Sequence, residues 1–123
     1  MLGGAQLVTF LPTTDGDDAR AFYEGVLGLT FVEDQGFALV FDLHGTPLRI
    51  TRVESFTPQP FTVIGWAVDD LEATVRGLVE RGVTFERYEQ LDQDDLGIWA
   101  SPGGTRVAWC RDPDGNTIGL STS

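Results

Sequence analysis

Hydrophobic and polar side chains alternate over much of this chain, as they do in β-strands that bury one face. The alternating stretches are short and are separated by turn residues such as glycine, proline and aspartate. The sequence therefore predicts a protein rich in short strands. The predicted strands lie in residues 5–11, 28–33, 61–68, 82–87 and 98–101, and in two turn-containing stretches, 37–51 and 107–121.

Two other stretches follow the helical period of about 3.6 residues. Each begins at an aspartate, Asp15 or Asp70, and ends at a glycine, Gly28 or Gly82, which are residue types suited to starting and ending a helix. The apolar side chains expected on the buried helix faces are Ala19, Phe22, Tyr23, Val26 and Leu27 in the first helix, and Leu71, Val75, Leu78 and Val79 in the second.

The chain also contains an internal repeat. GLTFVE at 28–33 recurs as GVTFER at 82–87, and the first strands of the two halves align with Val8 over Val63. The later strands align at a larger offset, so residues at about 88–104 form an insertion in the second half, with acidic side chains in its first part. Each half is strand, helix, strand, strand, strand. This order predicts an α+β fold of two tandem βαβββ modules.

Length and composition limit the classes of protein to consider. With 123 residues, we expect one domain over 1–123, with module one at about 5–53 and module two at about 61–121. A net charge of −11, with arginine as every basic residue, argues against nucleic acid and anionic membrane surfaces as partners. The single cysteine, Cys110, excludes an intrachain disulfide and a multi-cysteine zinc site. Neither a secretion signal nor a membrane span is visible, so we expect a cytoplasmic protein.

Two motifs carry a resemblance to a known family. ARAFYEGVLGLTF at 19–31 and RDPDGNTIGL at 111–120, in this order, resemble the vicinal oxygen chelate superfamily of glyoxalase I, bleomycin-resistance proteins and extradiol dioxygenases. The resemblance covers nearly the whole chain. It implies that the two modules form a curled, cup-shaped mixed sheet, with the helices outside and a ligand inside.

The resemblance also implies where metal ligands would lie. Metal-dependent members carry one ligand on the first strand and one on the last strand of each module, usually histidine or glutamate. The corresponding positions here are Val8, Arg49, Val63 and Gly119, and none of these residues can bind a metal. An arginine would repel a divalent cation. We therefore expect no metal and no other cofactor.

Arg49 is the strongest candidate for a functional residue. If Leu48 and Ile50 face the helices, strand alternation turns Arg49 toward the cup, where its guanidinium needs a partner. That partner is either a carboxylate such as Glu86 or an anionic or carbonyl group of a ligand. The residues that we expect to line the cup are Arg49, Gln6, Phe10, Thr51, Trp99 and Thr117.

Several other residues have simpler interpretations. His44 is expected in a surface turn and Trp66 in the core, whereas Trp99 is equally suited to the core and to a pocket. Gly119 interrupts a strand, either because a ligand residue is missing there or because another group approaches the backbone closely. The acidic insertion is expected to be a solvated loop, with a lid or a cation-attracting rim as the alternative.

Three functional hypotheses follow. The first is a protein of this superfamily without the usual metal, which binds a small organic molecule in its cup. The second is a lyase, isomerase or dioxygenase of the same superfamily that uses non-standard metal ligands. The third is an interaction module whose cup is filled by its own side chains. In each case the resemblance, together with the open edges of curled sheets, favours a homodimer.

Overall fold

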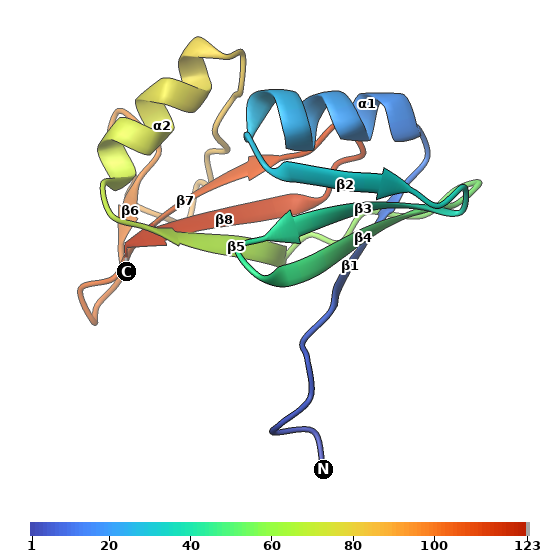
Figure 1. The fold of residues 1–123 in the computed structure, drawn as a ribbon. Helices are drawn as coiled ribbons and strands as arrows, with labels where there is room; N and C mark the ends of the chain where they lie inside the picture. The colour runs from blue at the N-terminus through green and yellow to red at the C-terminus, as the bar shows by residue number, and fades with distance from the viewer. Residues whose placement is uncertain (123) are drawn as a thin grey trace. The chain divides into compact units, whose positions relative to one another are not determined.

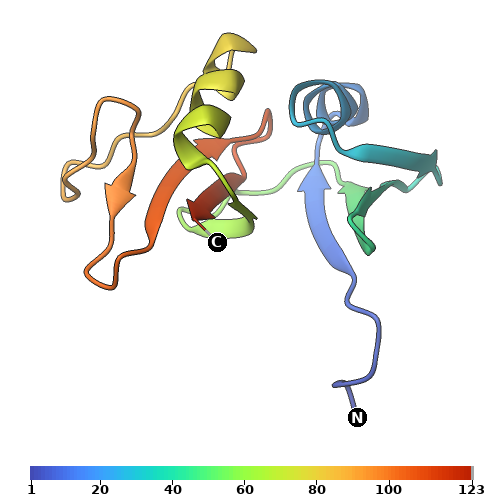
Figure 2. The same cartoon turned by 60° about the vertical axis from the view of Figure 1, so that its left-hand side comes forward.

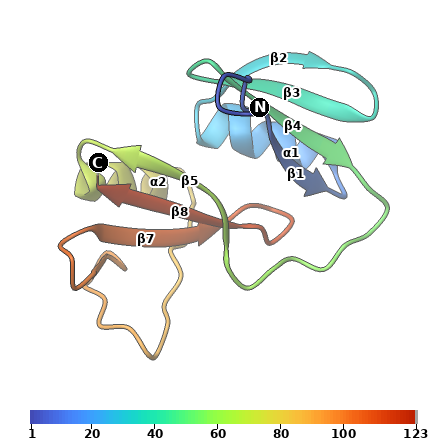
Figure 3. The same ribbon diagram turned by 90° about the horizontal axis from the view of Figure 1, so that it is seen from below.

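A computed structural model of the chain describes residues 1–122 (Figure 1). The chain divides into two compact units, Met1–Thr57 and Pro58–Ser123. Each unit contains one four-stranded mixed sheet, curled and open, with its helix on one face (Figures 1 and 3). The fold-class prediction is confirmed, because both units have the order strand, helix, strand, strand, strand.

In the first unit, the sheet has the order β1-β4-β3-β2, with β1 parallel to β4 and the other pairs antiparallel. The parallel pair follows from the helical connection that returns the chain to the same sheet. The elements of this unit are β1 (Thr9–Thr13), α1 (Gly16–Arg20), the π-helix η1 (Ala21–Val26), β2 (Thr30–Asp34), β3 (Ala38–Leu43) and β4 (Thr46–Arg52).

The second unit repeats this topology in the order β5-β8-β7-β6, with β5 parallel to β8. Figure 2 shows the insertion, in orange, leading to the edge strand β6 beside β7. The elements of this unit are β5 (Thr62–Val68), α2 (Leu71–Glu80), β6 (Trp99–Ala100), β7 (Arg106–Arg111) and β8 (Thr117–Thr122).

The first helical segment differs from the prediction in its geometry. Asp15 caps α1 by accepting a hydrogen bond from the backbone of Asp18, as expected. After Arg20, however, the chain continues as a π-helix, in which the backbone N–H of Leu27 donates to the carbonyl of Phe22, 2.9 Å away. The expected face still buries Ala19, Phe22 and Tyr23. In α2, which Asp70 caps, Val79 is exposed rather than buried.

The second predicted strand of module two is wrong in position. Residues 82–87 form no strand, and only Phe85 makes an isolated bridge, to Cys110 on β7. The strand at the sheet edge comes from the insertion instead, where Trp99 pairs with Val107. The insertion pairs with the first residues of β7, Arg106 and Val107, so residues 82–87 contact that strand in its later part, at Cys110.

The helix-facing side of each sheet forms a core. In the first unit, Tyr23 is fully buried and its ring lies 6.2 Å from that of Phe41. In the second unit, Arg106 pairs with Glu72 of α2, which identifies the side of β7 that faces this helix. Strand alternation then places Ala108 and Cys110 on the same side, where both are fully buried. The opposite sides of the two sheets are therefore free to carry a site.

Candidate functional site

The face of the first sheet that lies away from the helix brings three predicted site residues together. Leu48 and Ile50 are buried on the helix side of β4, so Arg49 and Thr51 lie on the other side. In the strand register, Arg49 lies directly opposite Phe10 of β1 and Val40 of β3. Phe10 is 62% exposed. A charged fork next to an accessible aromatic ring is a combination that can hold a ligand.

The Arg49 guanidinium is not satisfied by the residues described. Its side chain is half-buried, and its Nε atom is buried with no hydrogen-bond partner in residues 1–122. A buried donor without a partner costs roughly 1–3 kcal/mol. Glu86, the carboxylate that the sequence offers as a partner, forms an ion pair with Arg111 over 2.9 Å. Arg49 thus retains its capacity to bind an acceptor.

Gln6 occupies a different place from Arg49. It precedes β1, and its side-chain amide donates to the carbonyl of Gly45, 3.3 Å away, at the turn between β3 and β4. A second bond, of 3.0 Å, goes to the carbonyl of Leu7. The same turn contains His44, which is exposed and has a φ of 54°. Gln6 and His44 therefore lie at one end of the sheet. Gln6 is four residues before Phe10, the strand partner of Arg49, and His44 is five residues before Arg49 itself.

The four positions that correspond to metal ligands offer no donor set. Val8 is half-buried, Val63 is exposed, Gly119 is buried, and Arg49 is a cation. Within residues 1–122, no three or more His, Cys, Asp or Glu side chains gather in a way that could hold a metal ion.

Gly119 is explained by the side chains that meet above it. On the sheet face away from α2, it lies opposite Gly65 and Trp109. The indole Nε1–H of Trp109 donates to Oγ1 of Thr62 over 3.1 Å, and a Cβ atom at Gly119 would lie only 3.1 Å from Cγ2 of Thr62. Gly119 therefore leaves room for this hydrogen bond, so the close-approach interpretation accounts for it.

Trp109 is the centre of an aromatic cluster that the sequence analysis missed. Its ring lies 5.5 Å from Tyr88, edge to face, and 6.1 Å from Trp99. Trp99, left open between core and pocket, therefore lies beside Trp109 on the face away from α2. Strand alternation could have indicated this position of Trp109. Its neighbours Ala108 and Cys110 are buried against α2, so the Trp109 side chain lies on the opposite face. Trp66, expected in the core, lies opposite Leu120 on the α2 side but is only half-buried.

A pocket of about 260 Å³ lies next to this cluster, entirely within the second unit. Thr117, a predicted site residue, lines it and is only 3% exposed. Phe61, by contrast, is 59% exposed. We call this feature the ring pocket and define it by the eight residues that line it, Pro60, Phe61, Thr62, Tyr88, Gln90, Leu91, Trp109 and Thr117.

The insertion builds one wall of the ring pocket. The Gln93 side chain accepts from the backbone N–H of Tyr88 over 2.7 Å and donates to the carbonyls of Glu86 and Gly97. Arg87 donates to the carbonyls of Asp94 and Asp95. These bonds hold the loop that carries Tyr88 and Leu91, so the insertion is a tied structural loop. Burial of the Tyr88 phenol raises its pKa, and the nearby Glu86 carboxylate contributes to the rise.

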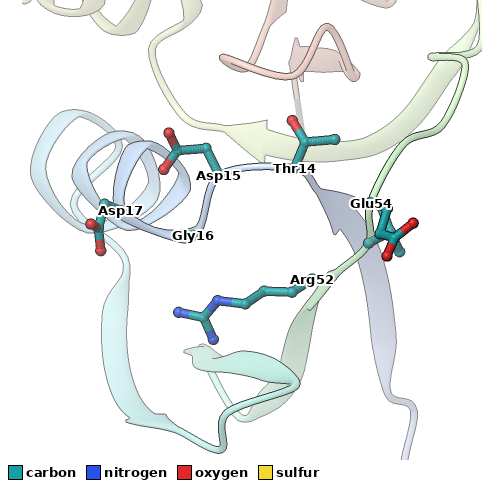
Figure 4. Close-up of a pocket in the computed structure, with 7 residues that line it drawn as sticks. Thr14, Asp15, Gly16, Asp17, Arg52 and Glu54 are labelled. Atoms are coloured by element: carbon teal, nitrogen blue, oxygen red, sulfur yellow. The ribbon is translucent and has the colours of Figure 1, made fainter.

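A larger pocket, of about 570 Å³, lies in the first unit beside Arg52 (Figure 4). The guanidinium of Arg52 is already used, because it binds both carboxylate oxygens of Asp34, at 2.8 and 2.9 Å, and the carbonyl of Gly36. This hydrogen bonding lowers the pKa of Asp34 to about 2. The other charged residues that line this pocket are all acidic: Asp15, Asp17 and Glu54. The basic side chain of this pocket is therefore already paired, and the other charged side chains around it are acidic. We assign the pocket a structural role.

No helix within residues 1–122 has the length and apolar character needed to span a membrane.

The fold is similar to those of several solved structures. A member of the glyoxalase/bleomycin resistance protein/dioxygenase superfamily from Sphaerobacter thermophilus is 23% identical, with full coverage of both chains and a TM-score of 0.78. A lactoylglutathione lyase from Agrobacterium tumefaciens is 21% identical, with 100% of this chain and 96% of that chain covered and a TM-score of 0.74. A bleomycin resistance determinant encoded on transposon Tn5 is 22% identical, with coverages of 96% and 97% and a TM-score of 0.75.

Among the curated proteins, none matches this chain. The family comparison is positive: residues 5–120 match the model described as Glyoxalase/Bleomycin resistance protein/Dioxygenase superfamily. This range includes β1 to β7 and most of β8, and with them both βαβββ units. The resemblance carried by the two sequence motifs is thereby confirmed, and the chain belongs to the glyoxalase/bleomycin resistance protein/dioxygenase superfamily.

Proposed function

We propose that this protein binds a small organic molecule without a metal, and that Arg49 anchors an anionic or carbonyl group of that molecule. The observation that carries the proposal is the buried, unpartnered Nε of Arg49 in residues 1–122. Phe10 and Thr51 lie next to Arg49 on the same sheet face and supply apolar surface and a hydroxyl group. Trp99 and Thr117, which the sequence also predicts to line the cup, belong to the second unit, where Thr117 lines the ring pocket. Gln6 is a peripheral member of the set.

The superfamily comparisons support a ligand-binding role in general terms. One similar structure is described as a bleomycin resistance determinant and another as a lactoylglutathione lyase. At identities of 21–22%, the likeness to these two proteins supports a shared fold and nothing more. The choice between sequestration and catalysis therefore rests on this chain's own residues. The residues at its metal positions favour binding without metal chemistry.

Arg49→Ala is expected to weaken ligand binding by about 10- to 150-fold, which corresponds to roughly 1.5–3 kcal/mol for a hydrogen bond to a charged group. The ligand would first be found by a thermal-shift screen of small carboxylates and neutral carbonyl compounds, and its affinity then measured by calorimetry. Arg76→Ala is the control, because it removes the same charge from an exposed position on α2. Unchanged affinity together with a large loss of stability would instead assign Arg49 a structural role.

The purified protein is expected to contain no stoichiometric transition metal. Val8, Val63 and Gly119 have no side-chain donor, and Arg49 repels cations. Elemental analysis after purification in metal-free buffer would test this. About one zinc, nickel, iron or manganese ion per chain would contradict it and would favour the alternative of a metal-dependent enzyme.

A homodimer is also part of the proposal. Leu7, Phe10 and Phe61 are each more than half exposed, and the edges of curled sheets favour pairing. Light scattering is expected to report a mass of about twice the 13.4 kDa of one chain. A monomer at micromolar concentration would count against it.

The proposal further includes a cytoplasmic location, since the single cysteine requires no oxidising compartment.

A further inference from the structure

We propose that the ring pocket of the second unit binds a planar, uncharged ring that carries a hydrogen-bond acceptor. The inference goes beyond the proposed function, because it stands on residues of the second unit and holds whether or not Arg49 anchors a ligand. It concerns side chains that the sequence analysis did not select, above all Trp109, Thr62 and Tyr88.

The size and lining of the pocket favour a ring. At about 260 Å³ it is slightly smaller than the roughly 300–1,000 Å³ of sites for drug-sized molecules, and so suits one ring or two fused rings. Phe61, Tyr88 and Trp109 give it three aromatic side chains. Tyr88 meets Trp109 nearly at right angles, at 83°, so the two rings form a corner rather than a closed stack. A planar ligand can contact such a corner by stacking on one ring and meeting the edge of the other.

The charge of the lining favours a neutral ligand. None of the eight residues that line this pocket is charged. Arg111, two residues along β7 from Trp109, is already paired with Glu86 over 2.9 Å. A charged group moved from water into this pocket would lose hydration without a counter-charge, which is costly. A net charge of −11 over the chain further disfavours an anion.

The hydrogen bond between Trp109 and Thr62 leaves a hydroxyl donor on the wall of the ring pocket. The indole has one donor, and Thr62 Oγ1 accepts it over 3.1 Å. The threonine hydroxyl therefore has its own proton left to donate, and no acceptor for it is found within residues 1–122. Thr62 can thus donate to a carbonyl oxygen or a ring nitrogen, while Trp109 contributes only its ring surface.

Benzamide is a suitable probe, because it is planar, uncharged and carries a carbonyl acceptor. Each of the three tryptophans gives an indole N–H signal in NMR spectra, and Trp109→Phe identifies the signal of Trp109. Benzamide is expected to shift that signal with a dissociation constant on the order of 1 mM, as for a weakly held fragment. Cyclohexanecarboxamide tests planarity and benzoate tests charge; both are expected to bind at least about fivefold more weakly.

Thr62→Val removes the hydroxyl donor, and with it the acceptor of the Trp109 indole N–H, while keeping the shape of the side chain. It is expected to weaken benzamide about fivefold and to leave toluene, which has no acceptor, unchanged. Thr84→Val is the matched control, because Thr84 is exposed and lies outside the ring pocket. The absence of a Trp109 shift with benzamide, equal binding of benzoate or cyclohexanecarboxamide, or an equal loss in Thr84→Val would each overturn the inference. The readout is the Trp109 signal in the second unit, and Arg49→Ala is expected to leave the benzamide shift of that signal unchanged, so the two proposals can fail separately.

Discussion

Gly65→Ala is expected to lower the free energy of unfolding by about 3 kcal/mol, at the upper end of the range for overpacked sites. A Cβ atom at Gly65 would lie 2.8 Å from the carbonyl oxygen of Gly119 on the neighbouring strand β8. Because the obstructing atom belongs to the backbone, no side-chain rotation relieves the contact. The two strands must separate, which would also disturb the bond between Trp109 and Thr62 above Gly119.

Urea unfolding of Gly65→Ala and of Gly77→Ala would test this. Gly77 lies within α2, and a Cβ atom there has no neighbour within 4 Å. Alanine at Gly77 is therefore expected to stabilise the protein by about 0.5–1 kcal/mol, because alanine favours the helix. A gain, or no change, in Gly65→Ala would show that β5 and β8 do not approach each other in this way.

Raising the pH above 9 is expected to destabilise the protein through Cys110, by about 1.4 kcal/mol per pH unit and about 4 kcal/mol by pH 12. Burial, together with the Glu86 and Asp112 carboxylates, raises the pKa of the Cys110 thiol to about 12 in the folded protein. The unfolded thiol ionises near pH 8.5 to 9. Between these pH values the thiol keeps its proton in the folded state but has lost it in the unfolded state. The contribution of Cys110 to the free energy of unfolding is therefore fully present below about pH 9 and decreases as the pH rises toward 12.

The difference in unfolding free energy between the wild type and Cys110→Ala isolates this effect, because other groups titrate in both proteins. The variant loses packing at every pH, and the gap between the two proteins should narrow as the pH rises from 9 to 12. A gap that stays constant would contradict the assignment. As a second check, the thiol should resist alkylation at pH 8 until the protein unfolds, since Cys110 is fully buried.

These experiments concern the surfaces on which the functional proposals rest. Gly65 and Gly119 keep β5 and β8 close together, and Trp109 lies across this contact to reach Thr62. Cys110, the next residue along β7, faces α2. One strand thus joins the ring pocket on one face to the core on the other, so stability and ligand binding should be measured together in each variant.

Much of the fold could be predicted because its signals are local. Asp15 and Asp70 cap their helices, Gly28 and Gly82 adopt positive φ after them, and the alternation of β4 buries Leu48 and Ile50 as expected. Helix capping and strand parity depend on neighbours within a few residues, so they can be read directly from the sequence. The same parity gives the side of β4 on which Arg49 lies.

Other features depended on tertiary structure. The repeat predicts a strand at 82–87, but the sheet edge is completed by Trp99 from the insertion, since strand pairing is decided by which segment reaches the free edge of β7. The ring pocket joins Thr62 of β5, Tyr88 of the insertion and Trp109 of β7, residues that are distant in sequence. The sequence by itself determined the α+β class and the two βαβββ modules, because periodicity and the internal repeat carry them, whereas the metal positions without donors followed from the resemblance to the family. Only the tertiary structure decided which partners Glu86, Gly119 and Trp109 have, because those contacts depend on strand register and loop closure.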